Sequence, residues 1–259
     1  MLSCHLYSLT VLLCSSLWVI VCRRLGKSSF QWLSLAMFIP SAVALAFNKD
    51  PEFWSNVYGK GEAAPSTVFS VFGGFIIILQ LAATSGINYV SGWGIEQADA
   101  KKTPEGSGDL FMGFFRAVGE EIGWRCFLLQ QLMKHYNPVL AVLISGVAWG
   151  VFHLPMMFML MKKPHVTHPW KSCLCQFLHR ILQSFLLSWL ARKAEYAIWP
   201  QAVAHFVWNR INPVIFGSMY TQKQGKIMGP VWKVNGEGLA GCLAILPFAL
   251  VFGWRLAAS

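Results

Sequence analysis

Eight long apolar stretches, separated by short polar connections, constrain this chain more than any other feature of its sequence. Each is close to the roughly 20 residues that a helix needs to cross a hydrocarbon core of about 30 Å. The stretches cover residues 5–22, 30–47, 67–90, 109–132, 138–161, 173–191, 197–216 and 237–256. We therefore expect an all-α polytopic membrane protein with about eight transmembrane helices. No connection is long enough to be a soluble domain, so residues 1–259 are predicted to form a single integral membrane domain.

The composition agrees with a lipid environment and argues against nucleic acid as a partner. Only 12% of the residues are charged and 55% are apolar, whereas soluble proteins average about 25% charged residues. The net charge is +10. A nucleic-acid site would require a cluster of basic residues, but no run of Lys and Arg here exceeds two residues. Basic loops facing anionic lipid head groups explain the charge. The bilayer is therefore the expected partner, and the expected location is a multi-pass position in a membrane.

Polar side chains inside the apolar stretches are candidate functional residues. A charged side chain at the centre of a bilayer costs about 2.5–3.5 kcal/mol on the insertion scale, so such groups are rarely present without a function. The candidates are Arg116, Glu120, Glu121, Arg125, His153, His179, Arg180, His205, Asn209 and Arg210.

The most informative motif is Glu120 and Glu121 followed by Arg125. On a helix, Glu121 and Arg125 are four residues apart and share a face, so they can form an ion pair. Glu120 points about 100° away and has no such partner. A carboxylate without a charge partner in an apolar site is suited to accept a proton near neutral pH, as a general base does. The alternative is that both glutamates belong to ordinary ion pairs between helices.

Two further motifs place imidazole side chains on separate helices. Trp149 lies one helical turn before His153, and His205 lies four residues before Asn209 on one helix face. Pro200 suits the first turn of the helix that carries the second pair. Taken singly, a histidine in an apolar helix is more often a buried hydrogen-bonding group, and a His/Asn pair can simply join two helices.

The residues of the three motifs are predicted to lie at similar depths in the membrane. At about 1.5 Å per residue, four side chains lie roughly 13–24 Å from the side where the fifth and seventh stretches begin. These residues are Glu120, His153, His205 and Asn209. A carboxylate base, two imidazoles and an amide can activate water and stabilise an oxyanion, which hydrolyses a carbonyl group without a covalent enzyme intermediate. We therefore expect the helices to enclose an intramembrane catalytic cavity.

At these residues the sequence resembles the CPBP family of intramembrane glutamic endopeptidases, which includes the type II CAAX prenyl endopeptidases. The family pattern is EExxxR, then an aromatic residue and xxxH, then HxxxN or HxxxB. The chain matches it with Glu120-Glu121-xxx-Arg125, Trp149-xxx-His153 and His205-xxx-Asn209. The motif-bearing core spans about 109–216. Trp149 stands where phenylalanine is usual, which keeps the aromatic character of the position.

The resemblance implies hydrolysis of a peptide bond in a membrane-associated protein or peptide, such as a prenylated CAAX-type chain, without a metal or another cofactor. Glu120 would be the general base, and His153 would help to hold the attacking water. His205 and Asn209 would donate to the oxyanion. Glu121 and Arg125, together with Trp149, would support the site.

Three other functions remain open from the sequence. A zinc-dependent membrane protease would also use histidine and glutamate, although the chain has no HExxH motif. A proton-coupled transporter would use the same residues as a relay and would show flux without cleavage. A non-catalytic member of the family would keep the fold as a membrane scaffold.

Overall fold

The computed structural model describes residues 2–27, 30–59, 63–97, 107–160, 166–218, 220 and 224–258. The long helices are α1 (Leu2–Arg24), α5 (Ala63–Ser91), α6 (Ser107–Glu121), α8 (Pro138–Leu160), α9 (Pro169–Lys193), α10 (Trp199–Phe216) and α12 (Leu239–Ala257). The shorter helices are α2 (Phe30–Leu33), η1 (Ser34–Phe38), α3 (Ile39–Phe47), α4 (Phe53–Tyr58), η2 (Ile122–Leu129), α7 (Gln130–Leu132) and α11 (Val231–Val234). Two short strands, β1 (Ile95–Glu96) and β2 (Ile227–Met228), pair antiparallel.

The protein is an all-α, integral multi-pass membrane protein. Helices occupy each of the eight apolar stretches of the sequence. Within the described residues, four helical segments are long and apolar enough to cross a membrane, namely Ser3–Arg24, Pro65–Ser91, Pro138–Met159 and Val231–Ala257. The helices that carry Glu120, Arg180 and His205 are not among these four, because α6 has only 15 residues and α9 and α10 contain more polar residues. The count of about eight spans therefore remains a prediction.

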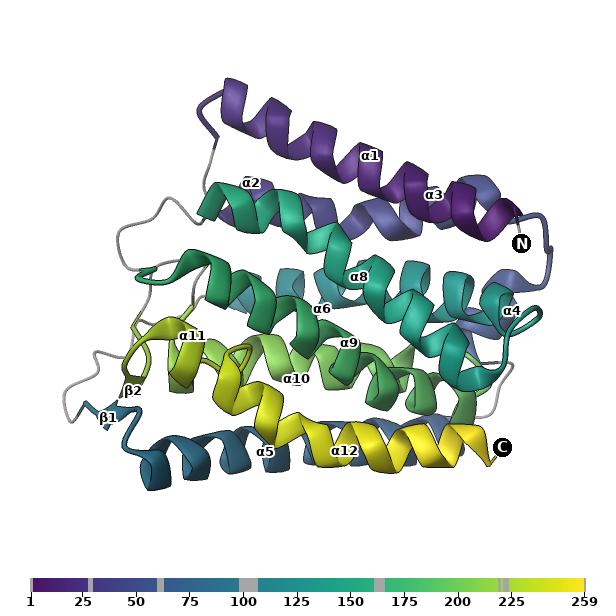
Figure 1. Cartoon of the computed structure of the whole chain (residues 1–259). Helices are drawn as coiled ribbons and strands as arrows, with labels where there is room; N and C mark the ends of the chain where they lie inside the picture. The colour runs from purple at the N-terminus through teal and green to yellow at the C-terminus, as the bar shows by residue number, and fades with distance from the viewer. Residues whose placement is uncertain are drawn as a thin grey trace.

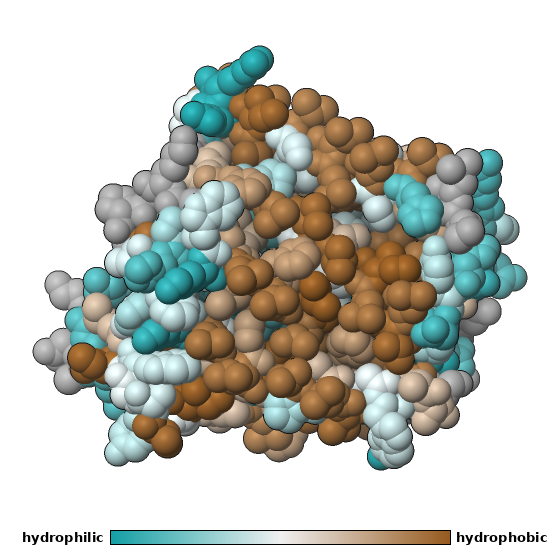
Figure 2. Space-filling model, in the orientation of Figure 1, coloured by the Kyte–Doolittle hydropathy of each residue, from teal (hydrophilic) through white to brown (hydrophobic). Residues whose placement is uncertain are grey.

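The surface shows how the helices are solvated. The long helices lie roughly alongside one another, with the β1–β2 pair and α11 near one end (Figure 1). In the same orientation, apolar side chains cover the middle of the visible face and polar side chains gather towards its two ends (Figure 2). Leu9, Leu13 and Leu17 of α1 are each more than half exposed. Large exposed apolar side chains in such a belt are suited to contact lipid, as the composition predicts.

The second apolar stretch is not the single helix that its hydropathy predicts. It forms α2, then the 3₁₀ helix η1, then α3, and Pro40 lies in the first turn of α3. Proline has no backbone N–H and suits a new helical start better than a helix interior. The break lets this segment follow the surface of α6 and η2, where Gly119 of α6 and Gly123 of η2 lie four residues apart. A methyl group on Gly119 would overlap Phe38, and one on Gly123 would overlap Pro40.

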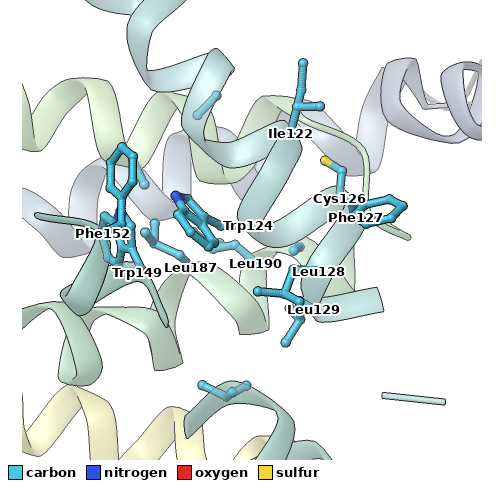
Figure 3. Packing of buried hydrophobic residues seen from close by; sticks show 14 of the residues in the cluster. Ile122, Trp124, Cys126, Phe127, Leu128, Leu129, Trp149, Phe152, Leu187 and Leu190 are labelled. Carbon is cyan, nitrogen blue, oxygen red and sulfur yellow. The ribbon is translucent and has the colours of Figure 1, made fainter. Parts of the chain in front are cut away.

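A π-helix, η2, continues directly from α6 and is the most deeply packed element near the site. All eight of its residues are buried, including Arg125. Trp124 packs edge-to-face on Phe152 of α8 with ring centroids 5.5 Å apart, and Leu187 and Leu190 of α9 belong to the same apolar cluster (Figure 3). π-Helical turns are uncommon and occur frequently at functional sites. The two glutamates occupy the last turn of α6, where this core begins.

Candidate active site

A cavity of about 580 Å³ lies between α6, α8, α9 and α10. Its wall includes Glu120 from α6, His153 from α8, and both His205 and Asn209 from α10. The structure thus brings together the four side chains that the sequence places at similar depth. All four side chains come from helices that pack against one another, and none of the four comes from a loop.

Glu121 is the centre of a buried charge cluster behind the cavity wall. Its Oε1 atom lies 3.2 Å from Nη1 of Arg125, and both side chains are fully buried. The same oxygen lies 2.7 Å from Nδ1 of His205. Nη2 of Arg125 donates to the hydroxyl of Ser184 at 3.2 Å. The ion pair that the spacing predicts is present, and His205 has a carboxylate partner that the spacing does not reveal.

Glu120 lies beside this cluster but has a different partner. The indole N–H of Trp149 donates to Oε2 of Glu120 at 2.6 Å. Among the described residues, Glu120 forms no ion pair. Of the two adjacent carboxylates, the one on the cavity wall is thus the one without an ion-pair partner among the described residues. The hydrogen bond is one that a phenylalanine at position 149 could not make, so the tryptophan contributes more than its aromatic ring.

The histidine of the second motif is held by the backbone. Nδ1 of His153 lies 2.9 Å from the carbonyl oxygen of Trp149, one turn earlier on α8. Because a carbonyl oxygen only accepts, Nδ1 must carry the proton, and Nε2 of a neutral ring is then an acceptor. An acceptor of this kind can receive a hydrogen bond from water in the cavity. The ring packs edge-on against Phe152 and Trp149, which limits its rotation.

Asn209 lies one turn after His205 and is half-buried on the cavity wall. The structure gives its side-chain amide no hydrogen-bond partner among the described residues. An amide N–H in this position is able to donate to a ligand in the cavity.

The remaining polar candidates of the apolar stretches separate into two groups. Arg116, Arg180 and Arg210 line the same cavity as the four motif residues. His179 does not; its ring stacks on Trp208 at 4.6 Å, and its Nε2 lies 3.0 Å from the side-chain nitrogen of Gln80. His179 therefore joins helices, and its presence in an apolar stretch does not mark a site.

Sequence reasoning missed the partner of Arg180. The structure pairs Arg180 of α9 with Glu237, which lies just before α12. The sequence does indicate that Arg180 has a partner, because an unpaired charge within a membrane span is costly. The partner itself could not be chosen, since the two residues are 57 positions apart.

A comparison with known families agrees with this geometry. Residues 109–211 match the family described as type II CAAX prenyl endopeptidase, Rce1-like. Over this stretch the chain is similar to the Rce1-like family. The match runs from α6 to α10 and contains Glu120, His153, His205 and Asn209. No curated protein matches the chain.

The resemblance read from the three motifs is thereby confirmed. The match relates the chain to CAAX-type intramembrane proteases in general and makes peptide hydrolysis the class of activity to test. In the described part of the chain, no three His, Cys, Asp or Glu side chains are grouped as a metal site would need. A cleavage assay with a chelator tests the zinc-dependent alternative directly.

Proposed function

We propose that this protein is an intramembrane endopeptidase that hydrolyses a peptide bond of a membrane-associated protein or peptide, with Glu120 as the general base. The observation that supports the proposal is Glu120 itself, a carboxylate that forms no ion pair with the described residues and lies on a cavity wall with His153. The indole N–H that donates to Oε2 of Glu120 is neutral, so it does not cancel the charge of the carboxylate. The other oxygen, Oε1, can receive a proton. The proposed substrate is a CAAX-type chain end, prenylated or plain.

The proposed reaction uses water as the nucleophile. A water held between Glu120 and Nε2 of His153 gives a proton to Glu120 as its oxygen attacks the carbonyl carbon. The carbonyl oxygen becomes an oxyanion, which His205 and the amide of Asn209 stabilise. Glu120 then returns the proton to the departing amine as the C–N bond breaks. No covalent enzyme intermediate forms in this sequence.

Glu121 has a defined part in the proposal. For Nε2 of His205 to donate to an oxyanion while Nδ1 donates to Glu121, the ring must carry both protons. A carboxylate 2.7 Å from Nδ1 stabilises that positive charge. Arg125 holds Glu121 in place from the other side. Glu121 and Arg125 thus act on the reaction through His205.

His205→Ala is expected to lower kcat by about 10²–10³-fold, the typical loss when one oxyanion donor is removed. Thermal unfolding in detergent should change little, because Arg125 still pairs with Glu121. His5→Ala, on an exposed face of α1, is the matched control and should keep the wild-type rate. A wild-type kcat for His205→Ala would remove His205 from the proposed site.

Trp149→Phe is expected to lower kcat by about 10-fold or more while KM stays within about twofold. The variant keeps an aromatic ring but loses the N–H that orients Glu120, and hydrogen bonds to charged groups contribute about 1.5–3 kcal/mol. Trp124→Phe is the matched control, since Trp124 is also fully buried and its indole N–H has no partner among the described residues. Equal kinetics for the two variants would show that the hydrogen bond to Glu120 does not matter.

The proposed activity is tested with purified protein in detergent and a mixed library of prenylated and plain peptides. We expect cleavage that persists in the presence of a chelator, and the cut sites will define the substrate class. Cleavage that a chelator stops would favour the zinc-dependent alternative. Ion-dependent flux in vesicles, with no cleavage of any peptide by a folded sample, would favour a transporter.

A further inference from the structure

A second hollow lies on the outside of the helix assembly, away from the central cavity. It is an open, almost entirely apolar groove of about 560 Å³ between α5 and α12, which pack along each other (Figure 1). Ala83 and Val90 of α5 line it, as does Leu243 of α12. Both helices belong to segments that are long and apolar enough to cross a membrane. The groove is therefore positioned to face the hydrocarbon of the bilayer.

Gly86 of α5 leaves open space on the wall of this groove. A methyl group added at this glycine would meet no atom within 4 Å, so no neighbouring side chain fills the position. Glycine in a helix interior costs about 1 kcal/mol relative to alanine. An opening without side chains in an apolar wall is suited to hold a hydrocarbon chain.

A cluster of lysine and tryptophan side chains lies at one end of the groove. Trp93, just beyond α5, lines the groove, and Nζ of Lys233 lies 5.5 Å from the centroid of its ring. The same amine lies 5.2 Å from the ring of Trp232, and Nζ of Lys171 lies 4.6 Å from that ring. Two amines and two indoles thus form one group, which we call the lysine–tryptophan cluster.

The two amines of this cluster can still bind an anion. Among the described residues, the side chains of Lys171 and Lys233 form no ion pair and no hydrogen bond. Lys171 is exposed and Lys233 is half-buried. The described acidic side chains at this end of the molecule are Glu96, which is exposed, and Glu237, which is paired with Arg180.

One buried residue fixes the cluster relative to the groove. The side-chain amide of Asn88 in α5 donates to the carbonyl oxygen of Val234 in α11 at 2.9 Å. The carbonyl oxygen of Asn88 accepts from the backbone N–H of Trp93 at 3.2 Å. Asn88 therefore holds Trp93 and the helix that carries Lys233 in place against α5, so the groove and the amines form a preorganised pair.

The cluster lies at the more basic end of the molecule. Exposed or half-buried basic side chains described at this end are Arg23, Arg24, Lys27, Lys171, Lys226 and Lys233, with Glu96 as the exposed acid. Those described at the opposite end are Lys49, Lys134, Arg192, Lys193 and Arg255, with the acids Asp50, Glu52 and Glu195. The positive-inside rule predicts that the more basic end faces the cytoplasm, where the membrane leaflet carries anionic lipids.

We propose that the groove and the lysine–tryptophan cluster bind one anionic phospholipid, with an acyl chain in the groove and the phosphate at Lys171 and Lys233. A lipid with a cationic choline group would bring a third positive charge to the two amines, which favours an anionic head group. Tryptophan rings commonly lie at the level of lipid head groups. The site is separate from the central cavity and does not depend on the proposed peptidase activity.

The first test compares two phospholipids with identical acyl chains, anionic phosphatidylglycerol and zwitterionic phosphatidylcholine. Purified full-length protein in detergent is titrated with each lipid, and the bound lipid is counted by native mass spectrometry. We expect the Kd for one phosphatidylglycerol to be lower by about 10-fold or more. Equal Kd values for the two lipids would overturn the assignment of the head group.

Two variants test the two parts of the site. Lys171→Gln with Lys233→Gln should raise the Kd for phosphatidylglycerol by about 10-fold or more, to the value for phosphatidylcholine. The matched control, Lys49→Gln with Lys193→Gln, removes two exposed lysines from the opposite end and should leave the Kd unchanged. Equal effects of the two double variants would show that only the net charge matters and would contradict the proposal.

Filling the groove is the second variant test. Gly86→Leu should raise the Kd for phosphatidylglycerol by about 5-fold or more, because the new side chain occupies the place of the acyl chain. Val68→Leu, at another exposed position of α5, is the control and should bind like wild type. An unchanged Kd in Gly86→Leu would overturn the place of the acyl chain. If Gly86→Leu weakens binding of an isoprenoid alcohol and not of phosphatidylglycerol, the occupant is an isoprenoid and the proposal is wrong.

Discussion

Glu120→Gln is expected to abolish measurable peptide cleavage, with kcat lowered by about 10²–10⁴-fold, the range that general base catalysis contributes. Glutamine has nearly the same shape as glutamate, and its carbonyl oxygen can still accept the hydrogen bond from Trp149. It cannot take a proton from water. The variant should therefore insert and unfold thermally like wild type, so that the loss is one of chemistry and not of folding.

Glu121→Gln is the control that separates the two adjacent glutamates. It removes a carboxylate at the next position, but that carboxylate is bonded to Arg125 and His205 and does not line the cavity. We expect it to lower the thermal stability clearly and to leave some cleavage. Abolished cleavage in Glu121→Gln with an active Glu120→Gln would reverse the assignment of the base.

Arg125→Ala is expected to destabilise the helix assembly by about 3–5 kcal/mol, the cost of leaving one member of a buried ion pair without its partner. Among the described residues, Glu121 would keep only His205 as a hydrogen-bond donor. The variant also removes the guanidinium that packs over the ring of Trp149 at 4.1 Å. Thermal unfolding in detergent measures the effect, and Arg23→Ala at the exposed end of α1 serves as the control.

A second variant shows whether the ion pair is the cause. Arg125→Met combined with Glu121→Gln removes both charges while keeping similar side-chain volumes. It should recover much of the stability that Arg125→Ala loses, because no uncompensated charge remains. An unchanged unfolding temperature for Arg125→Ala would show that the buried pair contributes little to the assembly.

The positions of most helices along the chain could be predicted from the sequence because the bilayer imposes a length and a depth. A helix rises by a fixed distance per residue, so position along an apolar stretch becomes position across the membrane. This relation alone predicts that Glu120, His153 and His205 lie at similar depth and can meet. The spacing of four residues between Glu121 and Arg125 likewise predicts their ion pair, which the structure contains.

Other features carry no local signal. Residues 122–129 are buried on every side, so their sequence has no polar face that could reveal a π-helix. The bond between Trp149 and Glu120 depends on how α8 is rotated against α6, which hydropathy does not specify. His179 and Arg180 are neighbours and both have polar side chains, yet of the two only Arg180 lines the cavity. Side-chain direction, and not residue type, distinguishes them.

The number of residues in the π-helix η2 also matters, independently of which side chains it carries. A residue added to or removed from an α-helix rotates everything beyond it by about 100°. A deletion among residues 122–124 would therefore turn the remainder of η2 and α7 relative to α6. Arg125 would leave the face that it shares with Glu121, although every residue type around it stayed the same.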